Sequence, residues 1–332
     1  MTPHSSRTLP PLIVILGPTA SGKTDLAVEL AKEFNGEIIN ADSRQVYREI
    51  DIASAKPKLT TNDYQLTTYH GVPHHLFDVA RPDEEFNVTH FKNLAVKTIC
   101  EIHARGKLPV LVGGTGLWIA AVVDNFIFPD VTPNPEFRTH PTIPSREGSL
   151  SDESVSVDAQ GGASPTNEQL YQQLIAKDPD AVDFINPKNR RRIIRALEVI
   201  EATGIPFSAQ RKKGPPLSHT LMLGLTRPIQ ELEERIAARI KEQLNDGLEE
   251  EERKLFLKYD ARLPALSSIS VREWKAYFDG AQSLAETLAL IRLHNRQYAK
   301  RQMTWFKRDK RIHWIENKEE AVGLIHKFHS TA

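Results

Sequence analysis

The sequence predicts an α/β fold in which helices flank a parallel sheet and a mainly helical insertion domain interrupts the core. Continuous apolar runs alternate with amphipathic helical patterns early in the chain, as expected for strands buried on both faces of a parallel sheet. A glycine-rich segment joins the first apolar run to the first helical pattern. A stretch rich in Pro, Ser and Gly (129–166) then precedes two further helical patterns. We therefore expect a core of residues 1–131 and 218–332 around an insertion of residues 132–217.

The first part of the core reads as alternating strands and helices. The apolar runs and the 3.6-residue spacing predict these elements: strand 12–16, helix 23–34, strand 36–42, helix 91–106 and strand 107–114. Gly106 closes the second of these helices, because glycine adopts the left-handed backbone of a helix C-terminus without strain. The order of these elements favours a parallel sheet with crossover helices.

The remaining elements follow the same rules. We expect helices 167–178 and 189–204 in the insertion, then strand 221–225, a helix from Pro228 and a helix of about 281–306. Gly204 closes the second insertion helix. Pro228 is expected in the first helical turn, where a missing N–H costs nothing. The helix after it has one apolar face, formed by Ile229, Leu232, Ile236, Ile240 and Leu244.

Composition excludes several classes of protein. The 332 residues are 40% hydrophobic and 26% charged, which is enough for a sizeable core and two domains. Because the formal net charge is zero, affinity for nucleic acid must come from a local basic patch. The single Cys100 excludes a disulfide framework and fits a reducing compartment. No segment resembles a signal peptide or reaches the roughly 18 apolar residues of a membrane span. We expect a soluble, cytoplasmic protein.

The segment GPTASGKT (17–24) has the spacing of a phosphate-binding loop, and its position between a strand and a helix supports a P-loop NTPase-like core. Backbone N–H groups of such a loop surround an anion, Lys23 adds a positive charge, and the Thr24 hydroxyl can bind Mg²⁺. The predicted diphosphate- or nucleotide-binding residues are Gly17, Pro18, Thr19, Ala20, Ser21, Gly22, Lys23 and Thr24. The loop alone leaves two ligands open: a nucleotide to be cleaved, or a diphosphate attached to a group to be transferred.

Two further segments lie at the carboxyl ends of strands, where ligands bind in open α/β sheets. Asp42 follows strand 36–42 and could bind magnesium, act as a general base, or only cap a helix. Gly113, Gly114 and Thr115 end strand 107–114; the glycines would let a ligand approach the backbone, and Thr115 could donate to a phosphate. A tight turn without a ligand explains this segment equally well. No acidic residue ends this strand, which weakens an ATPase interpretation.

Basic residues gather in two places. Residues 292–311 hold eight Lys or Arg and one acid, and Arg292, Arg296 and Lys300 share one helix face. A bound polyanion and a solvated face over an aromatic core explain this stretch equally well. Arg190, Arg191, Arg192 and Arg195 form a second cluster on the insertion, so the two units could clamp something long.

Three histidines, His70, His74 and His75, lie close together in the sequence. A metal pair is conceivable, but no third ligand is evident, and a structural role is favoured.

Several motifs together resemble the tRNA dimethylallyltransferase family, also called tRNA isopentenyltransferase. They are GPTASGKT, ADSRQVY, AKP, VPHHLFDV, RGKLPVLVGGTGLW, RRIIRALEVIEATG and YAKRQMTWFKRDKRIHW. The resemblance implies a P-loop core with a helical insertion, and transfer of a dimethylallyl group from dimethylallyl diphosphate to N6 of the tRNA adenosine beside the anticodon (position 37). The loop would then hold the diphosphate of the prenyl donor, and the target base would be flipped out of the anticodon loop.

The resemblance also implies roles for individual residues. Asp42 would be the general base, and Lys23, Thr24, Thr115 and Arg239 would act with Mg²⁺ on the leaving diphosphate. The residues implied to contact the tRNA anticodon stem-loop are Asp42, Ser43, Arg44, Gln45, Thr115, Arg138, Arg191, Arg192, Arg195 and the segment 267–272 with Arg272. From the basic stretch we add Arg296 and Lys300. We expect a monomer.

The chain departs from the family pattern at a few positions. In ISVRE (269–273), Ser270 and Val271 replace a glycine and a tyrosine, and Asn295 replaces a threonine. Asn189 replaces an aspartate and Trp118 a tyrosine. These changes concern RNA contacts more than the reaction type.

Three alternatives stay open beside prenyl transfer to tRNA. They are transfer to free AMP, ADP or ATP (an adenylate isopentenyltransferase), a P-loop nucleotide kinase, and a non-catalytic RNA-binding protein.

Overall fold

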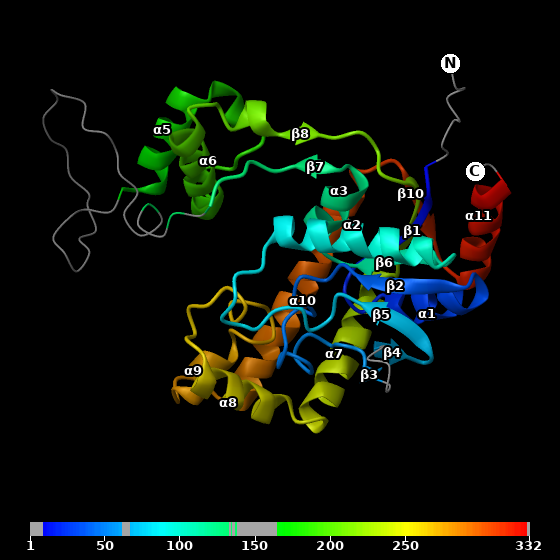
Figure 1. The fold of residues 1–332 in the computed structure, drawn as a ribbon. Helices are drawn as coiled ribbons and strands as arrows, with labels where there is room; N and C mark the ends of the chain where they lie inside the picture. Colours follow the sequence, from blue (N-terminus) through cyan, green and yellow to red (C-terminus); the bar gives the residue numbers. More distant parts are fainter. Residues whose placement is uncertain (1–8, 62–66, 133, 135–136, 138–164, 331–332) are drawn as a thin grey trace, which may run out of the picture. The chain divides into compact units, whose positions relative to one another are not determined.

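The computed structural model describes residues 9–61, 67–132, 134, 137 and 165–330 (Figure 1). The chain divides into two compact units. The larger unit combines Met1–Asn125 with Pro215–Ala332, and the smaller one is Phe126–Gly214. The insertion expected from the sequence, 132–217, overlaps the smaller unit over most of its length.

An eight-stranded sheet forms the centre of the larger unit, in the order β10-β9-β1-β6-β2-β5-β4-β3. Its strands are β1 (Pro11–Leu16), β2 (Gly36–Asn40), β3 (Thr60–Thr61), β4 (Thr67–Tyr69), β5 (Val72–His75), β6 (Leu108–Gly113), β9 (His219–Leu225) and β10 (Ile312–Ile315). The strands from β10 to β5 pair in parallel, which confirms the expected parallel sheet. Strand β4 pairs antiparallel with both β5 and β3 and forms an edge that the sequence patterns did not predict.

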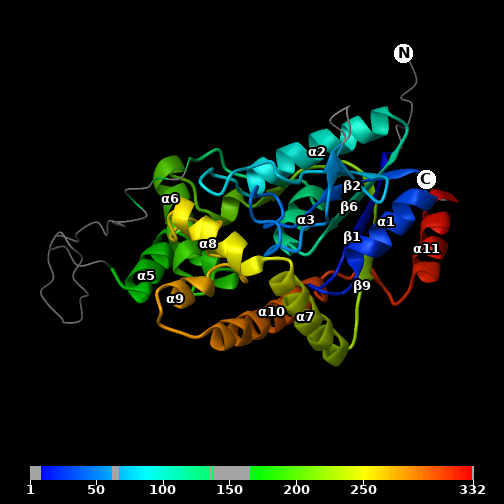
Figure 2. The ribbon, with the colours of Figure 1, turned by 90° about the horizontal axis from the view of Figure 1, so that it is seen from below.

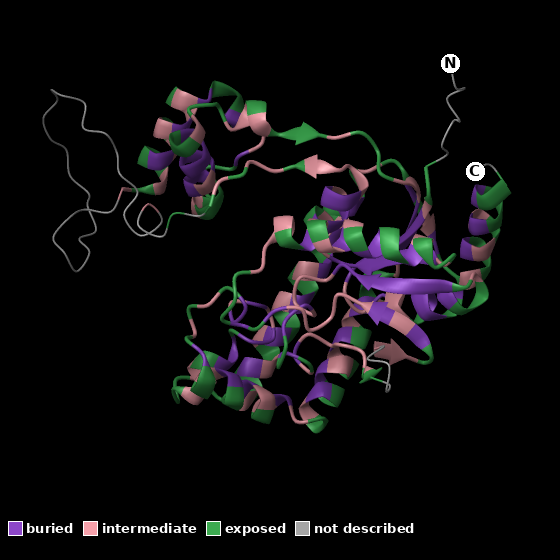
Figure 3. Cartoon of the chain, viewed as in Figure 1, coloured by how far each residue is buried: buried purple, intermediate pink, exposed green. Residues whose placement is uncertain are grey.

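Helices cover both faces of this sheet or pack against the helices that do so. They are α1 (Lys23–Glu33), α2 (Val88–Ala104), α3 (Gly116–Val123), α7 (Ile229–Asn245), α8 (Leu248–Lys258), α9 (Trp274–Phe278), α10 (Leu284–Phe306) and α11 (Lys318–Ser330). Helices α1 and α11 lie side by side on one face (Figure 2) and share a core with alternate residues of β1 such as Ile13 and Ile15. The intervening residues Leu12, Val14 and Leu16 pack against α2, α3 and α7 on the other face. The central strands are therefore buried throughout (Figure 3), which explains their continuous apolar sequence.

Local sequence signals explain where the helices begin and end. Ser283 and Glu286 form a capping box at the start of α10. Gly106 lies just after α2 with φ 67°, and Gly204 ends α6 (Arg190–Thr203) with the same φ, as expected for glycines that close helices. Pro228 was expected in the first turn of α7. It is instead the N-cap residue, one position before the helix begins at Ile229. Helices α3, α8, α9 and α11 and strand β10 were not predicted.

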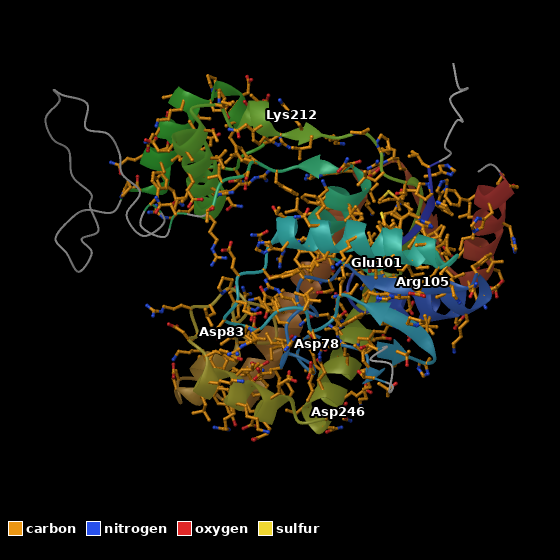
Figure 4. All side chains as sticks on the ribbon, viewed as in Figure 1. Asp78, Asp83, Glu101, Arg105, Lys212 and Asp246 are labelled. Carbon is orange, nitrogen blue, oxygen red and sulfur yellow. The ribbon has the colours of Figure 1, made fainter. Side chains whose placement is uncertain are left out.

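The smaller unit has its own core. It contains β7 (Phe126–Ile127), α5 (Asn167–Lys177), a 3₁₀ turn (Pro179–Asp183), α6 (Arg190–Thr203), a second 3₁₀ turn (Ser208–Gln210) and β8 (Lys212–Lys213). Apolar residues of α5 and α6, such as Leu170, Leu174 and Leu197, pack together. Strands β7 and β8 pair antiparallel, and Lys212 of β8 is labelled in Figure 4. The two helices of the expected insertion are therefore present.

Within the part of the chain that the structure describes, no helix combines the length and the apolar character that a membrane crossing requires.

Candidate active site

The phosphate-binding loop lies between β1 and α1, as its spacing predicted. Gly22 precedes α1 with φ 90°, a backbone conformation that favours glycine. No side chain caps α1, so the first N–H groups of this helix have no side-chain acceptor. The buried hydroxyl of Ser21 also has no partner among the described residues. These unsatisfied donors are typical of a site that awaits an anion.

Asp42 follows β2 and lies in a turn. Its backbone N–H donates to Asn40 Oδ1 (2.9 Å), and its own Oδ1 accepts the backbone N–H of Arg44 (2.9 Å). Turns and not a helix follow Asp42, so the helix-cap interpretation is wrong. The second carboxylate oxygen, Oδ2, accepts no hydrogen bond from the residues that the structure describes. It is therefore free to act on a ligand.

Contacts farther along the chain hold the loop after Asp42. Gln45 Nε2 donates to the carbonyl oxygens of Ser54 (3.1 Å) and Ala55 (3.0 Å). The nearly buried Lys56 amine pairs with Asp78 (2.5 Å), which Figure 4 labels. These contacts give Gln45 a structural role in addition to the RNA contact expected of it.

Lys23, Thr24 and Asp42 line one small cavity of about 40 Å³, together with His74 and Gly113. The pKa of Lys23 is lowered to about 8, because burial disfavours its charged form and the nearby Arg239 repels it, while Asp42 partly opposes these effects. Burial also lowers the pKa of Arg239, and Asp42 again opposes the shift. Two cations thus share one carboxylate, and this positive balance favours an anionic ligand.

Arg239 extends from α7 to the phosphate-binding loop. Its Nη1 donates to Thr19 Oγ1 (2.9 Å), and its Nη2 donates to Asn295 Oδ1 (3.0 Å). Its Nε is buried without a partner among the described residues. The sequence predicted a role for Arg239 only through the family resemblance, and the fold brings it to the loop from more than 200 residues away.

Gln302 of α10 joins two parts of the site. Its Oε1 accepts the backbone N–H of Thr19 (2.8 Å), and its Nε2 donates to the carbonyl of Gly114 (2.9 Å). A Cβ added to Gly114 would lie 2.2 Å from this Nε2, and one added to Gly113 would lie 2.2 Å from the Ala41 carbonyl oxygen. The paired glycines therefore admit close approach by the protein's own atoms, which favours the ligand-free turn of the two interpretations that the sequence left open for this segment.

Thr115 lies immediately before α3 and connects the ends of two strands. Its Oγ1 accepts the backbone N–H of Ser43 (3.0 Å) and lies 3.3 Å from Ser43 Oγ. Tyr298 of α10 hydrogen-bonds with Thr115, and its pKa is raised to about 12 by burial and by the charge of Asp42. Thr115 and Ser43 therefore belong to the same network as Asp42. Tyr298, Gln302 and Asn295 were missed as site residues, because their polar side chains resemble those of any helix face.

The basic residues of the larger unit that are predicted to contact RNA differ in whether other protein groups already bind their side chains. Arg44 donates to the Pro264 carbonyl (3.1 Å), and Arg272 pairs with Glu273 (2.9 Å). Arg296 pairs with Glu233 of α7 (2.6 Å), so part of its charge is compensated within the protein. Lys300 is exposed beside a groove of about 380 Å³ on α10, whose lining includes Trp305.

In the smaller unit, Arg191 and Arg192 are exposed on the first turn of α6. Arg195 pairs with Glu198 (3.1 Å) and donates to the Val131 carbonyl (2.8 Å), so it has a structural role within this unit. Arg138 lies outside the described residues.

The three histidines do not form a metal site. The described residues contain no group of three His, Cys, Asp or Glu side chains that could hold a metal ion. His75 instead pairs with Glu37 (2.7 Å), which also binds Arg105 (2.6 Å; Figure 4). His74 lines the cavity beside Asp42, with Nδ1 2.8 Å from the Val72 carbonyl and with no partner for Nε2 among the described residues. A structural role was predicted for His74, but its place near the end of β5 could have indicated a position in the site.

The residues of the site fit a magnesium ion that binds together with the anionic ligand of the phosphate-binding loop. The Thr24 hydroxyl and the Asp42 carboxylate line the same cavity. Mg²⁺ prefers oxygen ligands and is usually held by one or two carboxylates, water and substrate phosphates. The Thr24 hydroxyl beside a site for an anion fits this pattern when water and phosphate oxygens complete the ligand set, and Asp42 then stays available as a base.

Comparisons with known proteins agree with this geometry. Residues 45–309 match the family model for IPP transferase, and residues 10–68 match that for isopentenyl transferase. A tRNA dimethylallyltransferase of Roseiflexus sp. (strain RS-1) is 42% identical over 299 residues, 90% of each chain. Another, of Acetivibrio thermocellus, is 39% identical over 313 residues, 93% of this chain and 92% of that one.

Solved structures are similar as well. The crystal structure of full-length tRNA isopentenylpyrophosphate transferase from Bacillus halodurans has a TM-score of 0.64 at 35% identity, and the match covers 96% of this chain and 95% of that one. A eukaryotic dimethylallyltransferase acting on tRNA shares the fold, with a TM-score of 0.76 at 24% identity and coverage of 97% and 80%.

Proposed function

The chain belongs to the IPP transferase family and is a tRNA prenyltransferase, and we propose that it transfers a dimethylallyl group from dimethylallyl diphosphate to N6 of the adenosine beside the anticodon, at position 37 of tRNA. The family resemblance read from the motifs is confirmed by a family model that covers residues 45–309. One observation carries the detailed proposal. Lys23, Asp42 and Arg239 lie together at the phosphate-binding loop, so two cations and one carboxylate meet where diphosphate would leave.

The cations act on the leaving group. As the C–O bond to the prenyl carbon breaks, negative charge grows on the diphosphate, and donors already in place stabilise it. Lys23 and Arg239 supply positive charge, and the first N–H groups of α1 supply hydrogen bonds. Magnesium, when bound through Thr24, would neutralise part of the diphosphate charge.

The carboxylate acts on the acceptor. The N6 amine of adenine is a poor nucleophile, because its lone pair is conjugated with the ring. As N6 bonds to the prenyl carbon, Asp42 accepts the amine proton. The Oδ1 atom is held by the Arg44 N–H, which leaves Oδ2 for this proton. The products are prenylated tRNA, free diphosphate and a proton on Asp42, which later passes to water.

The RNA side of the proposal depends on exposed basic residues. Lys300, Arg191 and Arg192 are exposed cations that can contact phosphates, and Arg272 is half exposed despite its ion pair. The target adenosine must leave the stack of the anticodon loop to reach the half-buried Asp42 carboxylate. Monomeric state and a cytoplasmic location stay predictions.

A direct competition tests the reaction. Purified tRNA and AMP are incubated side by side with labelled dimethylallyl diphosphate and Mg²⁺, and label is expected on tRNA alone. Label only on AMP would favour an adenylate isopentenyltransferase. Phosphate released from ATP without a prenyl donor would favour a kinase or NTPase, and tRNA binding without product would favour a non-catalytic RNA-binding protein.

A salt titration tests the basic face. Lys300→Ala should weaken tRNA binding and reduce the slope of log affinity against log salt by about 0.7 to 0.9 if it contacts one phosphate. An unchanged slope would mean that Lys300 faces solvent in the complex.

A further inference from the structure

Two positions that depart from the family pattern, Ser270 and Asn295, are hydrogen-bonded to each other. Asn295 on α10 donates from Nδ2 to Ser270 Oγ (3.1 Å). Both residues are buried, with 5% of Asn295 and 4% of Ser270 exposed. Nothing in the sequence connects them, since they lie 25 positions apart and each belongs to a different motif. The fold makes them one contact.

This contact fixes the orientation of the Asn295 amide. Its Nδ2 donates to both Ser270 Oγ and the Ile291 carbonyl (2.9 Å), which uses both N–H groups. A flipped amide would place an oxygen against the Ile291 carbonyl and its N–H groups against the Arg239 guanidinium. The amide oxygen must therefore face Arg239, whose Nη2 donates to it (3.0 Å).

The oriented amide is the second anchor of Arg239. The first is Thr19 Oγ1, in the phosphate-binding loop, 2.9 Å from Nη1. With both ends of the guanidinium held, the remaining Nε is buried and has no partner among the described residues. A cation held in this way loses little freedom when an anion arrives, which favours binding and charge stabilisation.

The backbone of Ser270 supports a specific role for its hydroxyl. Ser270 has φ 72°, in the left-handed region that favours glycine, and the family pattern has glycine here. A serine at this position carries backbone strain that glycine would relieve. Its hydroxyl contact to Asn295 is the feature that glycine could not provide.

We propose that Ser270 and Asn295 form a paired positioning device that holds Arg239 against the phosphate-binding loop, so that its guanidinium is oriented for a diphosphate. The proposal rests on the proposed function for its choice of ligand. It concerns positioning and not chemistry, because neither residue lines the cavity beside Asp42.

The test measures binding of inorganic diphosphate with Mg²⁺ by calorimetry. Asn295→Leu keeps the side-chain size and removes both hydrogen-bonding groups; we expect the dissociation constant to rise about tenfold, the effect of losing one charged hydrogen bond. The KM for dimethylallyl diphosphate should rise with it, while tRNA affinity stays unchanged. Thr287→Val is the control, since Thr287 is an equally buried hydroxyl on the same helix, bonded to the Ser283 carbonyl (3.0 Å), and should bind diphosphate like wild type.

Ser270→Gly separates positioning from folding. It relieves the strained backbone, so thermal stability should not fall, yet diphosphate binding should weaken about threefold as the Asn295 amide loses its anchor. The double variant Ser270→Gly/Asn295→Leu should bind no worse than Asn295→Leu alone, because both changes act through one contact. Additive losses, or wild-type binding in Ser270→Gly, would overturn the pairing.

The two proposals fail in different ways. Weaker diphosphate binding in these variants, in a protein that does not prenylate tRNA, would support the positioning device and refute the proposed function. Prenylation by wild type with unchanged diphosphate affinity in Asn295→Leu would refute the device alone. Wild-type protein that fails to bind diphosphate would refute the device.

Discussion

Replacing Asp42 by asparagine tests the general base with little change to the fold. The amide is almost the same size, and its Oδ1 can still accept the Arg44 N–H that Asp42 Oδ1 accepts at 2.9 Å. The turn after β2 should therefore persist. What is lost is the ability of the second carboxylate oxygen to take a proton.

The expected loss has two parts. A positioned general base contributes about 10²- to 10⁴-fold to a rate, or roughly 3 to 5 kcal/mol of barrier. The second part concerns Lys23, whose pKa is about 8. The negative charge of Asp42 raises this pKa against the effect of burial. Without that charge the pKa of Lys23 falls further, so less of the amine is protonated at pH 7 and diphosphate binds more weakly.

The assay must separate these two parts. Single-turnover transfer of labelled prenyl group to tRNA, with donor saturating and at pH 6.5, keeps Lys23 protonated and reports the chemical step. We expect Asp42→Asn to slow this step by at least about 100-fold. Asp51→Asn is the matched control, because Asp51 is an exposed carboxylate of the same connecting segment that does not line the cavity. A rate for Asp42→Asn within threefold of wild type would refute the role of Asp42 as base.

Three further outcomes can be checked. Because Lys23 has a lowered pKa of about 8, its charge is lost as pH rises through that value, and calorimetry should find diphosphate affinity falling above pH 8; a flat profile to pH 9 would contradict this. Burial raises the pKa of Glu252 well above its usual value, so its contribution to stability is complete below about pH 4.5 and is lost as pH rises toward the raised value. Glu252→Gln should therefore gain Tm relative to wild type with increasing pH, and a difference in Tm that stays constant with pH would refute this. Gly114→Ala would place a Cβ 2.2 Å from Gln302 Nε2 and should weaken diphosphate binding about tenfold, whereas Gly323→Ala, where nothing lies within 4 Å, should not; equal effects would refute the argument.

Much of the fold could be predicted because it rests on local patterns. Strands β1 and β6 are continuous apolar runs, β2 contains the apolar pair Ile38 and Ile39, and α10 begins at a capping box that the sequence contains. The antiparallel β3–β4–β5 edge escaped prediction, because its short strands are mostly half exposed and β5 contains a proline. Helix α3 was missed because two glycines and a threonine precede it and suggest a turn.

The sequence by itself determined that an anion-binding loop joins a buried strand to a helix, and that Asp42 lies at the end of the next strand along the chain. Both features depend only on residues close together in the sequence: the backbone conformations of glycine, the spacing of apolar residues and the point at which a strand ends. The tertiary structure alone decided which distant side chains complete the site. Arg239, Asn295 and Gln302 come from helices more than 200 residues beyond the loop. Only the packing of α7 and α10 brings Arg239 and Gln302 to Thr19, and Asn295 to Arg239. Hydrogen bonds depend on distances of about 3 Å between atoms, and one-dimensional spacing fixes such distances only within a single element.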